Sequence, residues 1–111
     1  MYITICDHKK TEEIQEEFMR IFPYLRIEFI SKSSHKKGKS QIVGKYKRDK
    51  NTEHTVIIPK MTVGELVKQF LEKYGLALRI FRKAGRSWLE TSSTLEWTLE
   101  KQNAEGKALS N

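Results

Sequence analysis

The chain of 111 residues is 38% hydrophobic and 32% charged, a balance typical of one globular domain with a highly charged surface. Its single cysteine excludes a network of internal disulfides, and no apolar run approaches the roughly 18 residues of a membrane-spanning helix. The first ten residues lack the apolar stretch of a signal peptide, so we expect a cytoplasmic protein.

Residues 1–30 predict a first β-α-β unit. Apolar and polar residues alternate at the start of the chain, which indicates a strand with Ile3 and Ile5 on one face. A helix is expected to begin with Thr11 as its N-cap and to end at Pro23. Residues 25–30 (LRIEFI) alternate again and predict the second strand of the unit.

Residues 31–53 form a basic connecting segment. Residues 31–51 contain eight lysines and arginines and one aspartate, whereas the rest of the chain contains 13 basic and 13 acidic residues. The net charge of +7 therefore lies in this segment, and the remaining protein is neutral. The abundance of lysine, serine and glycine is typical of a solvated loop, although Ile42, Val43 and Tyr46 also allow a short hairpin.

Residues 54–83 predict a second β-α-β unit. A strand is expected over residues 55–59 (TVIIP). Thr62 and Glu65 have the spacing of a capping box at the start of a helix, and Gly75 is suited to follow its last turn. Residues 76–83 (LALRIFRK) predict the strand that completes the unit.

The two units also resemble each other in sequence. At a constant offset of 52 residues, the apolar positions of the first helix coincide with those of the second, and a one-residue slip aligns the strands that follow. The matched helix positions are Ile14 with Leu66, Phe18 with Phe70, and Phe22 with Tyr74. We therefore predict an internal repeat.

Residues 84–111 predict a hairpin and a final helix. A turn at residues 84–86 leads to a return strand around Trp88. Thr98 is the expected N-cap of the helix, and Gly106 is expected to end it. Leu95, Trp97 and Leu99 should close one end of the core.

Two β-α-β units in series predict an α+β protein. The favoured architecture is a ferredoxin-like plait, in which an antiparallel sheet carries both helices on one face. The alternative is a β-grasp-like second half, because residues 62–66 (TVGEL) follow a strand as in ubiquitin-like domains.

The C-terminal half resembles a group of short, uncharacterised bacterial proteins with no assigned function. The resemblance rests on five stretches: residues 62–66 (TVGEL), 75–79 (GLALR), 82–85 (RKAG), 88–91 (WLET) and 97–103 (WTLEKQN). It implies no activity, only that this half of the chain is a coherent unit.

Residue types that bind metals or perform catalysis are scattered along the chain. Cys6 and His8 would share one face of the first strand, but two ligands without a second pair do not make a structural zinc site. Residues 38–40 (GKS) match the end of a phosphate-binding loop, yet Ser33 replaces its first glycine and no apolar helix follows. We therefore predict neither an enzyme nor a cofactor.

The predicted plait leaves one face of its sheet without helices. By alternation, this face would carry Thr4, Cys6, Arg26, Glu28, Ala77, Arg79, Phe81, Trp88 and Glu90. Aromatic rings beside basic side chains are the ingredients of a base-stacking surface.

We predict a non-enzymatic binding domain that contacts nucleic acid through the basic segment 32–50 beside this sheet face. Lysines outnumber arginines in the segment, which favours nonspecific contacts with the phosphate backbone. The candidate residues are Lys36, Lys37, Lys39, Lys45, Lys47, Arg48, Arg79 and Phe81. An acidic protein and membrane headgroups are alternative partners. The alternative function is a protein-interaction or homo-oligomerisation module, possible as a homodimer, that uses an apolar surface around Phe81, Trp88 and Trp97.

Overall fold

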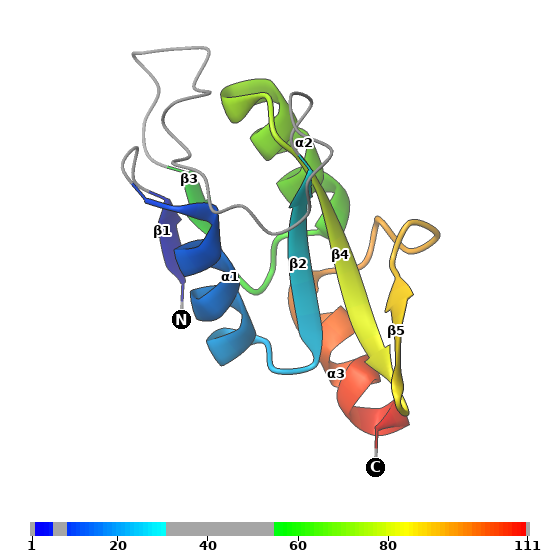
Figure 1. Cartoon of the computed structure of the whole chain (residues 1–111). Helices are drawn as coiled ribbons and strands as arrows, with labels where there is room; N and C mark the ends of the chain where they lie inside the picture. The colour runs from blue at the N-terminus through cyan, green and yellow to red at the C-terminus, as the bar shows by residue number, and fades with distance from the viewer. Residues whose placement is uncertain (1, 6–8, 31–54, 111) are drawn as a thin grey trace.

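The computed structural model describes residues 2–5, 9–30 and 55–110. The elements in this part of the chain are β1 (Ile3–Ile5), α1 (Thr11–Ile21), β2 (Leu25–Ile30), β3 (Thr55–Ile57), α2 (Val63–Tyr74), β4 (Ala77–Ala84), β5 (Ser87–Glu90) and α3 (Leu99–Leu109) (Figure 1). The predicted α+β class and the order of the elements are confirmed. The predicted basic segment lies outside the described residues.

The strands form two antiparallel sheets. In the smaller sheet β1 pairs with β3, so that Ile3 lies opposite Ile57 and Ile5 lies opposite Thr55. In the larger sheet β4 is central, with β2 on one side and β5 on the other. Each β-α-β unit thus pairs its first strand with the first strand of the other unit, and its second with the second. The described pairing gives two sheets where the sequence predicted one.

The strand registers bring matching positions of the two units together. Thr4 lies opposite Val56, 52 residues further along the chain, and Ile27 lies opposite Ile80, 53 residues further along. These are the offsets at which the helices and the following strands match in sequence. If an approximate two-fold axis related the two units, each antiparallel strand pair would be centred on two residues that occupy equivalent positions in the two units. The internal repeat stays a prediction, and these registers are compatible with it.

Helix α1 begins one residue earlier than predicted. Lys10 occupies the N-cap position, its backbone N–H donates to Glu13 Oε1 at 3.4 Å, and Thr11 is the first helical residue. Thr11 is buried and follows the N-cap as part of the first helical turn. Ile14 and Phe18 are buried without any exposed surface, which explains the helical spacing of the apolar residues.

Helix α2 has the predicted ends. Thr62 Oγ1 accepts a hydrogen bond from the Glu65 N–H at 3.1 Å, and its hydroxyl lies 3.1 Å from Glu65 Oε1. Gly75 has a φ of 64°, the left-handed conformation that glycine adopts without steric cost, and its N–H bonds to the Leu71 carbonyl. Phe70 and Tyr74 are buried, and their rings contact each other at a centroid distance of 5.2 Å.

Helix α3 starts as predicted but does not end at Gly106. Thr98 caps it, accepting from the Lys101 N–H at 3.2 Å, and the helix continues to Leu109. Gly106 lies inside it, where a Cβ atom would be 2.9 Å from Tyr24 Cβ and 3.0 Å from the Tyr24 carbonyl oxygen. Glycine is needed at this position because α3 packs closely against Tyr24, the residue before β2. It does not mark the end of the helix.

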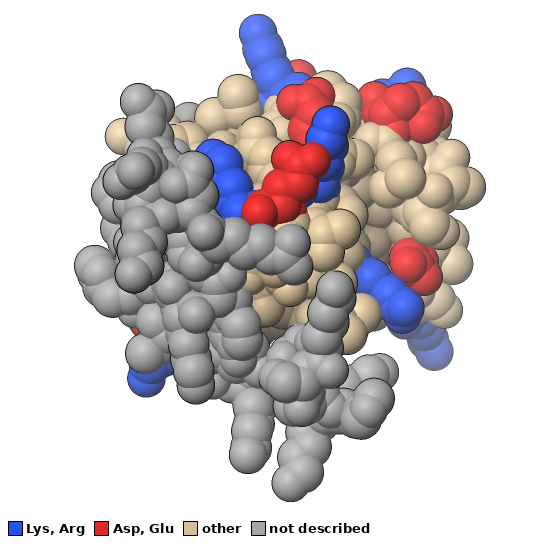
Figure 2. Space-filling view, turned by 90° about the horizontal axis from the view of Figure 1, so that it is seen from above, with Lys and Arg blue, Asp and Glu red and all other residues tan. Residues whose placement is uncertain are grey.

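The larger sheet separates a buried face from a helix-free face. Leu25, Ile27, Leu78 and Ile80 are buried in the main core. Helices α2 and α3 lie behind β4 in Figure 1, on this buried side, while the side turned to the viewer carries no described helix. In the view from above, basic side chains of the described residues lie beside acidic ones (Figure 2).

Candidate functional site

The helix-free face of β2, β4 and β5 carries the charged and aromatic residues of these strands. Their registers place Arg26 opposite Phe81, Glu28 opposite Arg79 and Lys83 opposite Trp88. Glu90 completes the row, opposite Phe81 on the other side. Since alternate residues of a strand face the same way, these side chains share one surface, which we call the open sheet face: Arg26, Glu28, Arg79, Phe81, Lys83, Trp88 and Glu90.

Trp88 lies between two cations on the open sheet face. The Arg26 guanidinium carbon and the Lys83 ammonium nitrogen are each 5.9 Å from the centre of a Trp88 ring. These distances lie at the outer limit of a cation–π interaction. Trp88 and Phe81 are both half-buried, so one part of each ring packs on the sheet and another part is accessible. An aromatic ring flanked by positive charge can stack on a base while its neighbours contact phosphates.

Two ion pairs partly neutralise this surface. Arg26 Nε lies 3.9 Å from Glu28 Oε1, and Arg79 Nε lies 3.6 Å from Glu90 Oε1. All four side chains are well exposed, so each pair contributes little to stability, about 0–1 kcal/mol. With three basic and two acidic residues, the open sheet face has a net charge of only +1. Strong attraction of a polyanion therefore requires further basic residues.

The structure brings together part of the predicted site. Arg79 and Phe81 lie on the open sheet face with Arg26 and Trp88, as the alternation of the strands indicated. Lys83 was missed, although the same alternation, continued by two residues from Phe81, would have found it. The predicted binding residues Lys36, Lys37, Lys39, Lys45, Lys47 and Arg48 lie outside the described residues. Thr4, expected on the same face, lies in the smaller sheet instead.

Trp97 lies apart from Trp88. Its ring is 5.4 Å from the Arg82 guanidinium carbon and 4.3 Å from Lys101 Nζ. Arg82 precedes Lys83 in β4 and therefore points to the other side of the sheet, where its Nη1 donates to Gln102 Oε1 of α3 at 2.9 Å. The structure therefore places Trp97 with the residues that hold α3, whereas Phe81 and Trp88 share the open sheet face.

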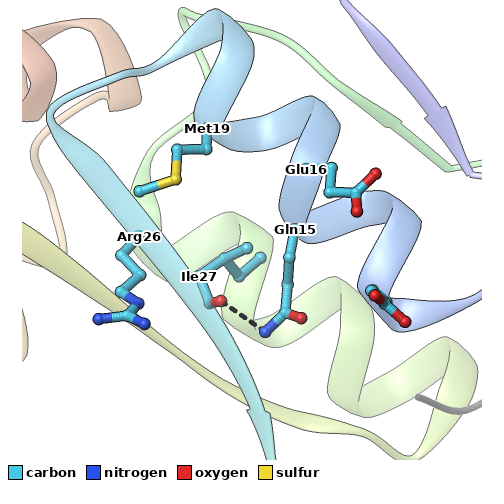
Figure 3. Close-up of a pocket in the computed structure, with 6 residues that line it drawn as sticks. Gln15, Glu16, Met19, Arg26 and Ile27 are labelled. Carbon is cyan, nitrogen blue, oxygen red and sulfur yellow. Dashed lines mark hydrogen bonds between the residues drawn. The ribbon is translucent and has the colours of Figure 1, made fainter. Parts of the chain in front are cut away.

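A hollow of about 210 Å³ lies between α1 and β2 (Figure 3). Its lining includes Glu12, Glu16, Met19 and Arg26, and Gln15 Nε2 donates to the Ile27 carbonyl at 3.0 Å across its floor. This hydrogen bond satisfies a backbone acceptor at the edge of β2. The two exposed glutamates would repel a phosphate, so the hollow does not extend the open sheet face as a nucleic-acid site.

The described residues contain no cluster of three or more histidine, cysteine or acidic side chains that could hold a metal ion. Cys6, His8, His35 and His54 lie outside the part of the chain that the structure describes. No helix in that part is long and apolar enough to cross a membrane.

Comparisons with known proteins identify no relative. No protein-family model matches the chain, no curated protein matches it, and no solved structure matches its fold.

Proposed function

We propose that this protein is a non-enzymatic domain that binds single-stranded nucleic acid on its open sheet face. The observation that carries the proposal is the position of Trp88 and Phe81, half-accessible on a helix-free surface, with Arg26 and Lys83 beside the indole. Stacking of a base on an aromatic side chain contributes about 1–3 kcal/mol and tolerates any base. The proposed readout is therefore nonspecific.

The basic segment supplies the charge that the open sheet face lacks. The segment follows directly in the sequence after Ile30, the last residue of β2. Lysine is a flexible point charge, suited to phosphates in many geometries. If about five phosphates are neutralised on a single strand, the logarithm of the binding constant should fall with the logarithm of salt concentration with a slope of about −3.5.

A fluorescence-anisotropy titration tests the proposal with labelled oligo(dT) and a duplex of equal length. We expect binding at low salt, weakened by Trp88→Ala and lost when Lys36, Lys37, Lys39, Lys45, Lys47 and Arg48 are all replaced by Gln. Leu89→Ala is the matched control, because Leu89 is the next residue of the same strand, is 48% exposed and faces the other side of the sheet. Absence of binding at low salt would contradict the proposal. Unchanged binding by the variant in which all six basic residues are replaced by Gln would contradict it as well.

The second candidate function is a protein-interaction or homodimerisation module. It is favoured by the accessible parts of Phe81 and Trp88, since aromatic residues are enriched in protein interfaces. Trp97 would belong to a different surface, beside α3. Light scattering coupled to a sizing column separates the two functions: a dimer that Trp88→Ala dissociates supports an interface, and a strict monomer argues against homodimerisation.

The finer description of the fold belongs to the same proposal. A ferredoxin-like arrangement of two repeated units is supported by the strand–helix–strand order of each unit and by the antiparallel pairing of β1 with β3. The pairing of β2 with β4 favours a sheet that departs from a simple plait, and a β-grasp-like second half is the alternative. An experimental structure tests both, and cell fractionation tests the proposed cytoplasmic location.

A further inference from the structure

Strand β4 extends beyond its neighbour β5. The β5 pairing covers residues 81–84 of β4, and one more bond follows it, in which the Thr91 N–H donates to the Ile80 carbonyl at 3.0 Å. The chain then turns away, with the Thr94 N–H bonded to the Thr91 carbonyl. Residues 77–79 of β4 therefore have β2 on one side and no described strand on the other (Figure 1).

The backbone of Leu78 faces this uncovered edge. In an antiparallel strand, alternate residues direct both N–H and C=O to the same edge. Lys83 bonds to the Tyr24 carbonyl toward β2, whereas Ile80 bonds toward Thr91, so Leu78 points the same way as Ile80. Among the described residues, none forms a hydrogen bond with the Leu78 N–H or C=O on this edge. Leu78 is only 4% exposed, and backbone groups at such positions nearly always have a partner.

The uncovered edge forms one wall of a groove of about 230 Å³. Val63 and Val67 of α2 and Leu95 of the β5–α3 loop supply an apolar wall across from Leu78. Arg79 and Glu90 line its rim, where Glu90 lies 3.6 Å from Arg79 Nε. The Arg79 side chain is 55% exposed, so the other guanidinium nitrogens are accessible to a second acidic group.

We propose that this groove binds a partner peptide in an extended conformation, which adds to β4 as an antiparallel strand. One peptide residue would exchange two hydrogen bonds with Leu78, and its side chain would lie on the same face as Leu78, against Val63, Val67 and Leu95. That residue is therefore apolar. The residue before it lies opposite Arg79, where an acidic side chain meets the guanidinium. The partner is thus an extended segment with an acidic residue followed by an apolar one, bound by strand addition.

The direct test is an NMR titration of the isotope-labelled full-length protein with blocked tetrapeptides of sequence Glu-Xaa-Thr-Thr, where Xaa is leucine, valine or alanine. No residue precedes the glutamate, because Thr91 already lies opposite Ile80. We expect saturable shifts of the Leu78, Ile80 and Thr91 amides, with the leucine peptide binding most tightly. The matched control carries an N-methyl group on the leucine, which removes the donor to the Leu78 carbonyl. It should bind about tenfold more weakly, because a nearly buried carbonyl is left unpaired.

Two variants of the protein locate the site independently of the peptide. Leu95→Ala removes part of the apolar wall, and Leu71→Ala is its matched control, since the two leucines are 42% and 41% exposed and only Leu95 lines the groove. Leu95→Ala should weaken binding severalfold and Leu71→Ala should not.

The proposal is overturned if no peptide gives saturable shifts at millimolar concentration, if the N-methylated peptide binds equally, or if both variants bind alike. Shifts of the same amides on concentrating the protein alone would assign the edge to a second copy of the chain and overturn it as well.

Discussion

Replacing Gly106 by alanine has two opposing effects on the stability of the protein, and their magnitudes can be compared. In a helix interior, alanine is more favourable than glycine by about 1 kcal/mol. The new Cβ would stand 2.9 Å from Tyr24 Cβ, 3.0 Å from the Tyr24 carbonyl oxygen and 3.3 Å from Arg82 Cγ. Two of these atoms cannot rotate away, because one is backbone and the other is attached directly to it. Overpacking of this kind costs about 1–3 kcal/mol, so we expect a net loss of about 1 kcal/mol.

Thermal and urea unfolding of Gly106→Ala measure this loss. A decrease of about 1 kcal/mol should lower Tm by about 4–8 °C in a domain of this size. Ala104→Gly is the matched control, since Ala104 is exposed in the same helix and should lose up to about 1 kcal/mol from helix propensity alone. Both substitutions should therefore destabilise the protein, although one replaces glycine by alanine and the other replaces alanine by glycine. A Gly106→Ala variant that is about 1 kcal/mol more stable would refute the close approach of α3 to Tyr24.

Three further predictions follow from burial, capping and exposure. Phe18→Ala, at a core position with no exposed surface, should lose about 3–5 kcal/mol in urea unfolding, and a loss below 1 kcal/mol would contradict its burial. Thr98→Ala should lose about 1 kcal/mol because the Lys101 N–H loses its acceptor, whereas Thr98→Ser should retain most of the stability. Trp88→Ala should weaken oligonucleotide affinity by about 1–3 kcal/mol, roughly 5- to 150-fold, and an unchanged affinity would remove the indole from the interface.

Local signals predicted most elements because each depends on residues close in sequence. Alternation located β2 and β4, and the spacing of Ile14 and Phe18 located α1. The capping residues Thr62 and Thr98 and the left-handed Gly75 were also readable, since a cap involves only the neighbouring turn.

Contacts between distant segments could not be predicted in the same way. Gly106 was interpreted as a helix end because glycine commonly follows a last turn, and only the position of Tyr24 reveals its packing role. Strand pairing likewise depends on long-range geometry: periodicity predicted strands, but it could not indicate that β2 would pair with β4 and leave β1 with β3.

The candidate site was predictable only to the extent that it follows from alternation. Alternate residues of a strand lie on the same face of a sheet, so Arg79, Phe81 and Trp88 were correctly placed on one surface. The flanking of Trp88 by Lys83 depends on the register between β4 and β5, which the sequence pattern does not specify. The edge of β4 at Leu78, which no described strand covers, depends on where β5 departs from β4.

The most direct test of the proposed function is an NMR titration of the labelled protein with oligo(dT) at low salt. Binding on the open sheet face predicts that the largest shifts occur at the Trp88 indole N–H and at the amides of Arg26, Phe81 and Lys83, while the Trp97 indole beside α3 changes little. No saturable shifts, or shifts centred on Trp97 with Trp88 unaffected, would contradict it.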